Sequence, residues 1–149
     1  MKPAAKVVLS SVAATSAMTF FSYMVSDQKN KNFREPELLA DFFESVDVKE
    51  KISLPSGWVT HYLIGAGFAA GYKLFLKFEN KKATFRNGLF YGAIAGLTGI
   101  LSWQMLFQNQ HGIHKTNKKG FYAQLIIAHI IFGLTLAAIE KPDLENNVD

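Results

Sequence analysis

Two histidines, His61 and His129, stand in long apolar segments of the chain. His61 opens the stretch HYLIGAGFAAGYK, His129 opens HIIFGLTLAAIEK, and each stretch ends on a lysine. Imidazole can form a neutral hydrogen bond, transfer protons near neutral pH, or ligate a metal ion or haem iron. Because ionisable groups in hydrocarbon are costly, this pair is the first candidate for a functional site.

The two stretches align without a gap, which indicates a duplicated pair of helices. Chance similarity between segments rich in glycine and alanine is the alternative. Each histidine shares a helix face with a glycine four residues later and an alanine eight residues later, namely Gly65 and Ala69, and Gly133 and Ala137. Small residues mark close helix contacts, so we expect both histidines at equal depth and pointing into the protein.

Three roles stay open for this pair: a neutral packing role, proton sensing or relay, and ligation of haem or a metal. The small residues beside the histidines leave little room for a porphyrin, so no cofactor is predicted. The polar side chains expected within reach are those of Ser22, Thr60, Ser102, Gln104 and Gln124.

A second histidine pair, His111 and His114, lies in the polar segment QNQHGIHKTNKK. With Asp41 or Glu44 the pair could bind zinc, but Gly112 and the polar flanks favour a solvated loop. The chain has no cysteine, no GxSxG or HExxH motif, and no acidic pair within an apolar run. We therefore expect a protein that is not an enzyme.

Four apolar runs position these residues. They cover residues 7–25, 54–72, 88–107 and 121–139, and each is close to the roughly 20 residues that cross a bilayer. The charged residues, 19% of the chain, lie mainly between the runs. The pattern predicts an all-α bundle with four transmembrane spans, forming a single membrane domain over residues 1–149. The first run is rich in serine and threonine, and a cleaved signal peptide is its alternative.

The polar connector between the first two runs contains one apolar stripe. Pro36 suits the start of a helix, and the stripe predicts an amphipathic helix over residues 36–47 that lies at the membrane interface. Its members are Leu38, Leu39, Phe42, Phe43 and Val46. We expect this helix to lie across the mouth of the bundle.

Four spans place both termini on one side of the membrane. Lysine and arginine are equally numerous on the two sides, but those on the side of the termini are concentrated in one short hairpin, so the termini are expected to be cytoplasmic. The net charge of +4 flanks the spans and forms no basic stripe, which argues against nucleic-acid binding.

Glycines spaced by four residues predict tight helix packing. Gly67 and Gly71 form one such pair, and Gly88, Gly92 and Gly96 form two overlapping pairs. These glycines could hold the bundle together or mediate a homo-oligomer.

The order of several motifs resembles that of the YagU-like inner-membrane proteins, a family of small polytopic bacterial proteins. The shared motifs are Thr60-His61, Phe68-Ala69, Gly71-Tyr72, Gly88-Leu89, Gly92-Ala93, Ala95 and Ala128-His129. The resemblance covers residues 60 to about 135 and implies a multi-pass protein of the bacterial cytoplasmic membrane.

Three functions remain as hypotheses. The first is a non-enzymatic membrane protein in which the histidine pair has a structural or proton-sensing role. The second is a small solute or proton carrier or channel acting as a dimer. The third is a redox protein that binds haem or a metal through His61 and His129.

Overall fold

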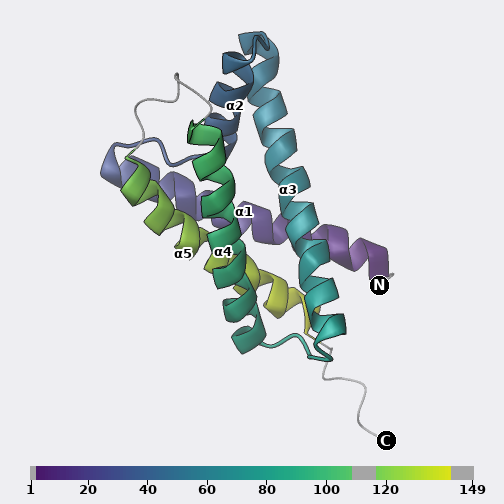
Figure 1. Cartoon of the computed structure of the whole chain (residues 1–149). Coiled ribbons are helices and arrows are strands. Elements are labelled where there is room, and N and C mark those ends of the chain that lie inside the picture. Colours follow the sequence, from purple (N-terminus) through teal and green to yellow (C-terminus); the bar gives the residue numbers. More distant parts are fainter. Residues whose placement is uncertain (1–2, 109–116, 142–149) are drawn as a thin grey trace, which may run out of the picture.

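A computed structural model describes residues 3–108 and 117–141 of the chain. This part consists of five helices joined by short connections: α1 (Pro3–Lys29), α2 (Glu35–Ser45), α3 (Glu50–Phe78), α4 (Phe85–Gln108) and α5 (Lys118–Glu140). No strand occurs within these two ranges. The predicted all-α class is confirmed (Figure 1).

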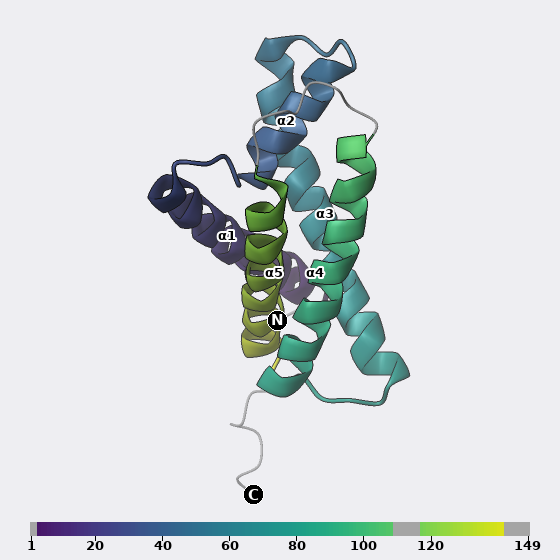
Figure 2. The same cartoon turned by 60° about the vertical axis from the view of Figure 1, so that its left-hand side comes forward.

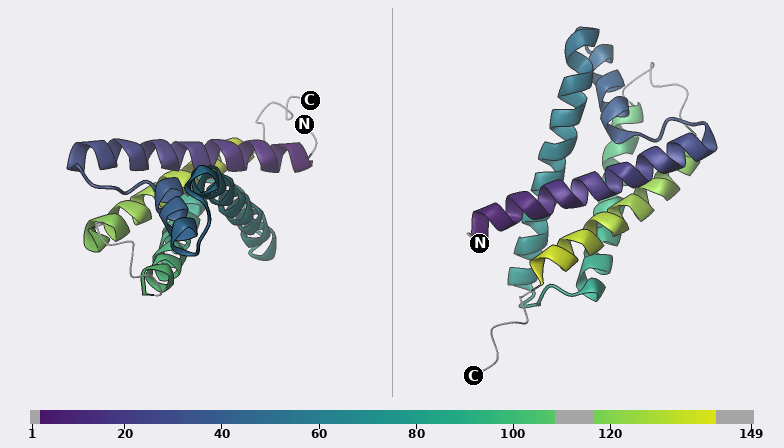
Figure 3. Two further views of the ribbon diagram at one scale, coloured as in Figure 1. Left: turned by 90° about the horizontal axis from the view of Figure 1, so that it is seen from above. Right: turned by 180° about the vertical axis from the view of Figure 1, so that it is seen from behind.

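Helix α5 lies between α1 and α4 and packs against both (Figure 2). Helix α1 runs beside α5 and crosses α3 obliquely, as the two views of Figure 3 show. The short α2 folds back along the first half of α3. The site described below is therefore lined by helices from the whole length of the chain.

Three helices are long and apolar enough to cross a membrane. They cover Ala5–Lys29, Phe85–Gln108 and Lys118–Glu140. Helix α3 is longer, with 29 residues, but it does not belong to this set. Its first half carries Ser53, Ser56, Thr60 and His61, which lower its hydropathy. The structure thus supports three of the four predicted spans by length and composition.

Six serine and threonine side chains of α1 are buried, whereas five of its large apolar side chains are exposed. The buried set is Ser10, Ser11, Thr15, Thr19, Ser22 and Ser26, and the exposed set is Val8, Leu9, Val12, Phe20 and Met24. A helix of a water-soluble protein has the opposite arrangement, because its apolar stripe faces the core. Helix α4 likewise exposes large apolar residues, including Phe90, Leu97, Leu101 and Met105. Together with the three apolar helices, these outward faces indicate a membrane protein.

Glycines bring α4 and α5 into backbone contact. A Cβ atom at Gly133 would collide with the carbonyl oxygen of Gly88 and would lie 2.9 Å from the Cα atom of Gly92. At Gly92 the added atom would lie 2.8 Å from the Cα of Ile130, and at Gly96 it would lie 3.1 Å from the Cα of Ile126. Gly88, Gly92 and Gly96 therefore form the close contact that their spacing predicts, and Gly133 forms the one expected of a small residue on the face of His129.

The other predicted glycine pair behaves differently. A Cβ atom at Gly67 would have no neighbour within 4 Å, whereas one at Gly71 would lie 2.7 Å from the Tyr91 hydroxyl. The packing role expected of Gly67 within this chain is therefore wrong, because Gly67 lies on the exposed side of α3. Gly57, which the sequence did not single out, allows the backbone of α2 to approach α3 at Pro36 and Ala40.

Helix α2 is shorter than the predicted segment 36–47, and its apolar stripe is only partly buried. Leu38 and Leu39 are buried, Phe42 and Phe43 are half-buried, and Val46 lies beyond the helix end with 53% of its surface exposed. The stripe breaks at Val46 because the chain leaves the helix there and turns through Asp47 at a φ of 66°.

Candidate functional site

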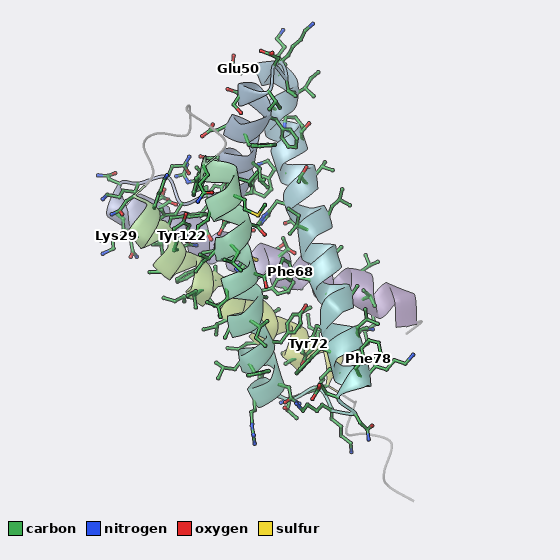
Figure 4. The ribbon with its side chains drawn as sticks, in the orientation of Figure 1. Lys29, Glu50, Phe68, Tyr72, Phe78 and Tyr122 are labelled. Carbon is green, nitrogen blue, oxygen red and sulfur yellow. The ribbon has the colours of Figure 1, made fainter. Side chains whose placement is uncertain are left out.

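A cavity of about 200 Å³ lies in the middle of the helices. All five helices contribute to its wall. Its lining residues include Thr15, Met18, Glu35, His61, Phe68, Trp103, His129 and Phe132. Figure 4 shows Phe68 and Tyr72 on the side of α3 that faces α4, with Glu50 and Phe78 near the two ends of that helix.

His61 is held by α1. Its side chain is 6% exposed, and Nε2 lies 2.8 Å from Thr19 Oγ1. The Thr19 hydroxyl donates its single proton to the carbonyl oxygen of Thr15 at 2.7 Å, so its oxygen accepts from His61. This assigns the proton of a neutral His61 to Nε2.

His129 is fixed by its own helix and by an aromatic neighbour. Its Nδ1 lies 2.9 Å from the carbonyl oxygen of Leu125, which can only accept, so Nδ1 carries the proton. The ring of Phe68 meets the imidazole edge-on, with centroids 5.6 Å apart. A neutral His129 therefore keeps a free lone pair on Nε2, an atom close to Gly99 in the cavity wall.

Both histidines are buried and line one cavity, although the faces that they share with small residues contact different helices. Gly65 lies against Thr15 of α1, whereas Gly133 lies against Gly88 and Gly92 of α4. The two repeated stretches therefore have similar burial, but they contact each other through Phe68 and not through their glycine faces.

None of the five polar partners proposed from the sequence bonds to either histidine. Ser102 and Gln104 lie on the exposed face of α4, and Ser102 donates to the carbonyl oxygen of Thr98. Ser102 still borders the cavity. Their assignment as buried polar groups is wrong, because α4 turns its glycine face toward α5 and this face away from it.

Ser22 and Gln124 are buried but serve a third residue, Glu35. Ser22 Oγ donates to Glu35 Oε1 at 2.8 Å, and Gln124 Nε2 lies 3.4 Å from the same oxygen. Gln124 also bonds to Ser22, so α1, α2 and α5 meet at one carboxyl group. The second oxygen of this carboxyl, Oε2, is buried without a hydrogen-bond partner.

Burial raises the pKa of Glu35 to about 7. Hydrogen bonds from its own backbone, Ser22 and Gln124 lower the pKa, but their effect is smaller than that of burial. The side chain is only 3% exposed. The neighbouring cation, Arg34, bonds instead to Asp27 and Glu37. An ionised Glu35 would thus be a buried charge without a counter-ion.

The sequence does contain a pattern that points to Glu35. The pattern is easy to overlook because Glu35 is one of several charged residues in the connector. Glu35 stands three residues before Leu38 and four before Leu39, so a helix that starts at Glu35 carries all three on one face. Glu140 is a second carboxylate not singled out from the sequence. It accepts from Ser10 at 2.9 Å and pairs with Lys73 at 3.3 Å, which joins the ends of α1, α3 and α5.

The described residues contain no group of three or more histidine and acidic side chains that could hold a metal ion. Ligand pockets usually measure about 300–1,000 Å³. The cavity volume of about 200 Å³ is smaller and does not suit a haem between His61 and His129. His111 and His114 lie outside the described residues.

Comparisons with protein families, curated proteins and solved structures find nothing that matches this chain.

Proposed function

We propose that the chain is a multi-pass membrane protein that responds to protons through this central cavity. One observation carries the proposal: Glu35 lines the cavity together with His61 and His129, and its Oε2 is buried without a partner. Buried ionisable groups inside a membrane protein are expensive to keep and commonly mark a functional site. No enzymatic step is needed for this role.

Protonation of Glu35 controls how firmly α2 is held. Below a pH of about 7 the carboxyl is neutral and links α2 to Ser22 of α1 and Gln124 of α5. Above it, the carboxylate is a buried charge that water or a displacement of α2 must solvate. Raising the pH therefore loosens α2 and opens the cavity.

Other charged or ionisable groups lie around Glu35 and contribute to the electrostatics of the cavity. His61 of α3 and His129 of α5 line the same cavity as Glu35, Tyr23 of α1 interacts with Glu35 electrostatically, and Arg34 and Glu37 flank it on α2. The cavity residues contributed by α4 carry no charge. A test must therefore separate Glu35 from these groups.

A four-span arrangement accounts for the apolar surface of α3 as well as for the three apolar helices. Val59, Leu63, Ile64 and Leu74 of α3 are exposed, and lipid would cover them. In this arrangement α2 lies at the membrane interface and α1 stays in the mature protein, because its polar face closes the cavity. A bacterial cytoplasmic membrane with cytoplasmic termini follows from the resemblance and the charge distribution, and self-association stays a prediction.

The absence of cysteine makes the opening of α2 measurable. A Leu39→Cys variant places a thiol at a buried cavity position, and a Lys49→Cys variant places one in the exposed segment after α2. In vesicles treated with a membrane-impermeant maleimide, we expect the ratio of the two labelling rates to rise several-fold from pH 6 to pH 8. The reactivity of any cysteine thiol rises with pH, and dividing one labelling rate by the other removes this shared effect.

Adding Glu35→Gln should keep this ratio low at both pH values, whereas Asp41→Asn should leave the response intact. Asp41 is the matched control, because burial also raises its pKa, helped by Glu44 and Glu37. A ratio independent of pH, or a response that survives Glu35→Gln, would refute the proposal. Lys82→Cys, beyond the other end of α3, should react only from the opposite side of the membrane if α3 is a span.

A further inference from the structure

The two ends of the protein differ in charge. The end where α3 is connected to α4 and where α5 finishes carries seven basic side chains against two carboxylates, a net charge of +5. The basic residues are Lys6, Lys73, Lys77, Lys81, Lys82, Arg86 and Lys141, and the acids are Glu79 and Glu140. The opposite end carries seven residues of each sign. Both counts cover only the described residues, so Lys2, Lys115 and the three acids after Lys141 lie outside them.

The connection between α3 and α4 is held in one shape by its own hydrogen bonds. Asn80 has a φ of 49°, and the backbone N–H of Lys81 donates to the carbonyl oxygen of Leu76 at 2.8 Å, as in a Schellman motif. The side-chain nitrogen of Asn87 donates to the carbonyl oxygen of Lys82 at 2.8 Å and ties the connection to the first turn of α4. Residues 77–86, called the basic hairpin below, therefore present their side chains from a fixed backbone.

Three cations of the basic hairpin are free to bind an external anion. Lys77, Lys82 and Arg86 are exposed and have no carboxylate partner in the described parts of the chain. The hairpin contains one acid, Glu79, and Lys81 already pairs with it at 3.2 Å. The charge of the three free cations is thus not compensated within the hairpin.

Exposed aromatic rings accompany these cations. Phe78 ends α3 and is 80% exposed, and Phe85 begins α4 and is 52% exposed (Figure 4). The ammonium nitrogen of Lys141 lies 3.6 Å from the centroid of the Phe85 ring. A soluble anion would neutralise the cations but would leave both rings in water. A phospholipid satisfies both groups, because its headgroup is charged and its acyl chains are apolar.

The position of the hairpin also suits a lipid headgroup. Helix α4, which starts at Phe85, is one of the three helices that are long and apolar enough to cross a membrane. The hairpin therefore lies where this helix would leave the hydrocarbon. Basic clusters next to a membrane-spanning helix are attracted to anionic lipids.

We infer that the basic hairpin binds the headgroups of anionic phospholipids in the leaflet on its side of the membrane. Lys77, Lys82 and Arg86 contact the lipid phosphates, and Phe78 and Phe85 lie against the upper part of the acyl chains. The inference rests on the multi-pass arrangement proposed above, but it does not depend on Glu35 or on the movement of α2.

Fluorophores at the two ends of α3 can measure this preference, because the chain has no cysteine of its own. Phe78→Cys places a label in the basic hairpin, and Ile52→Cys, at a residue that is 55% exposed, places one at the other end of the helix. The full chain is reconstituted in vesicles of phosphatidylglycerol and phosphatidylcholine in equal amounts, with a nitroxide quencher on one lipid or the other. Both leaflets have the same composition, so the orientation of the protein does not affect the result.

Quenching at Phe78→Cys should be at least about threefold stronger when the nitroxide is on phosphatidylglycerol, whereas the ratio at Ile52→Cys should stay near one. At about 1 M sodium chloride the Debye length is about 3 Å, so the ratio at Phe78→Cys should also approach one. Sodium phosphate should lower the ratio no more than sodium chloride of equal ionic strength. A specific effect of phosphate would show that the hairpin binds a soluble anion and would overturn the assignment to lipid.

Substitution of the three free cations tests their role. Lys77→Gln/Lys82→Gln/Arg86→Gln should bring the ratio at Phe78→Cys close to one. Lys49→Gln/Lys51→Gln is the matched control, because these lysines are exposed beside the other end of α3, and it should leave the ratio unchanged. A ratio that survives the triple substitution would overturn the inference.

The two proposals fail separately. Equal quenching of Phe78→Cys by the two lipids removes only the preference for anionic headgroups. Absence of quenching by either lipid at both ends of α3 removes the multi-pass arrangement as well. Neither result bears on the labelling ratio at Leu39→Cys, which tests the response to protons.

Discussion

Replacing Glu35 with glutamine is expected to raise the melting temperature at pH 8 and to flatten its dependence on pH. The folded pKa of about 7 lies above the ordinary value of 4.5, so the associated stability is present in full below 4.5 and is lost as pH rises through about 7. This difference corresponds to about 3 kcal/mol. Glutamine has the shape of the neutral acid and cannot ionise, so it avoids that loss.

Circular-dichroism melts of the full chain in detergent from pH 5 to pH 8 measure this effect. The unmodified protein should lose thermal stability across the range, and Glu35→Gln should change much less. Glu50→Gln, at the exposed start of α3, is the control and should follow the unmodified protein. A Glu35→Gln variant that melts earlier than the unmodified protein at pH 8 would show that the carboxylate is stabilised by something else.

Gly133→Ala is expected to destabilise the bundle by about 3 kcal/mol, the upper end of the usual cost of overpacking. The new methyl group would meet the carbonyl oxygen of Gly88 and the backbone of Gly92, with the Gly92 nitrogen 2.9 Å away. Backbone atoms cannot rotate aside as a flexible side chain can. Relief therefore requires α4 and α5 to separate along their length.

Gly67→Ala is the matched control for this substitution. It adds the same methyl group in the middle of α3, but nothing lies within 4 Å of it. Because alanine favours helix formation by up to about 1 kcal/mol over glycine, this variant should be neutral or slightly more stable. Equal losses of melting temperature in the two variants would mean that the contact between α4 and α5 is not as close as described.

The helices themselves could be predicted, because the length of an apolar run can be counted along a continuous segment of the sequence. Each of the four apolar runs lies within a helix, but the helices extend further, as α3 does through Glu50 and Lys77. Their charged ends form helical hydrogen bonds as readily as the apolar middle, and hydropathy does not detect them. Only three of the four predicted spans are supported, because the first half of α3 is polar.

The contacts between helices could be predicted only where they depend on one strong local signal. Glycine spacing predicted a close helix contact at Gly88, Gly92 and Gly96, because glycine lets two backbones approach closely, but only the structure shows that the partner is α5. It could not show that Gly67 faces outward, since the rotation of α3 depends on where α1 and α2 pack. Thr19 as the partner of His61 follows from the oblique crossing of α1, which is also a property of the whole assembly.

Glu35 shows why the candidate site was only half predicted. The histidines stand out in an apolar background, whereas Glu35 is one of several acids in a polar connector. Only the fold reveals that α2 turns this carboxyl toward Ser22 and Gln124.

The titration of the Glu35 carboxyl by infrared difference spectroscopy tests the central claim most directly. Spectra of the unmodified protein minus Glu35→Gln should contain the carbonyl stretch of a protonated carboxylic acid at pH 6, and this band should disappear with a midpoint near pH 7. A carboxylate signal already complete at pH 6 would contradict the account, because Glu35 would then be ionised throughout the range in which the cavity is proposed to respond.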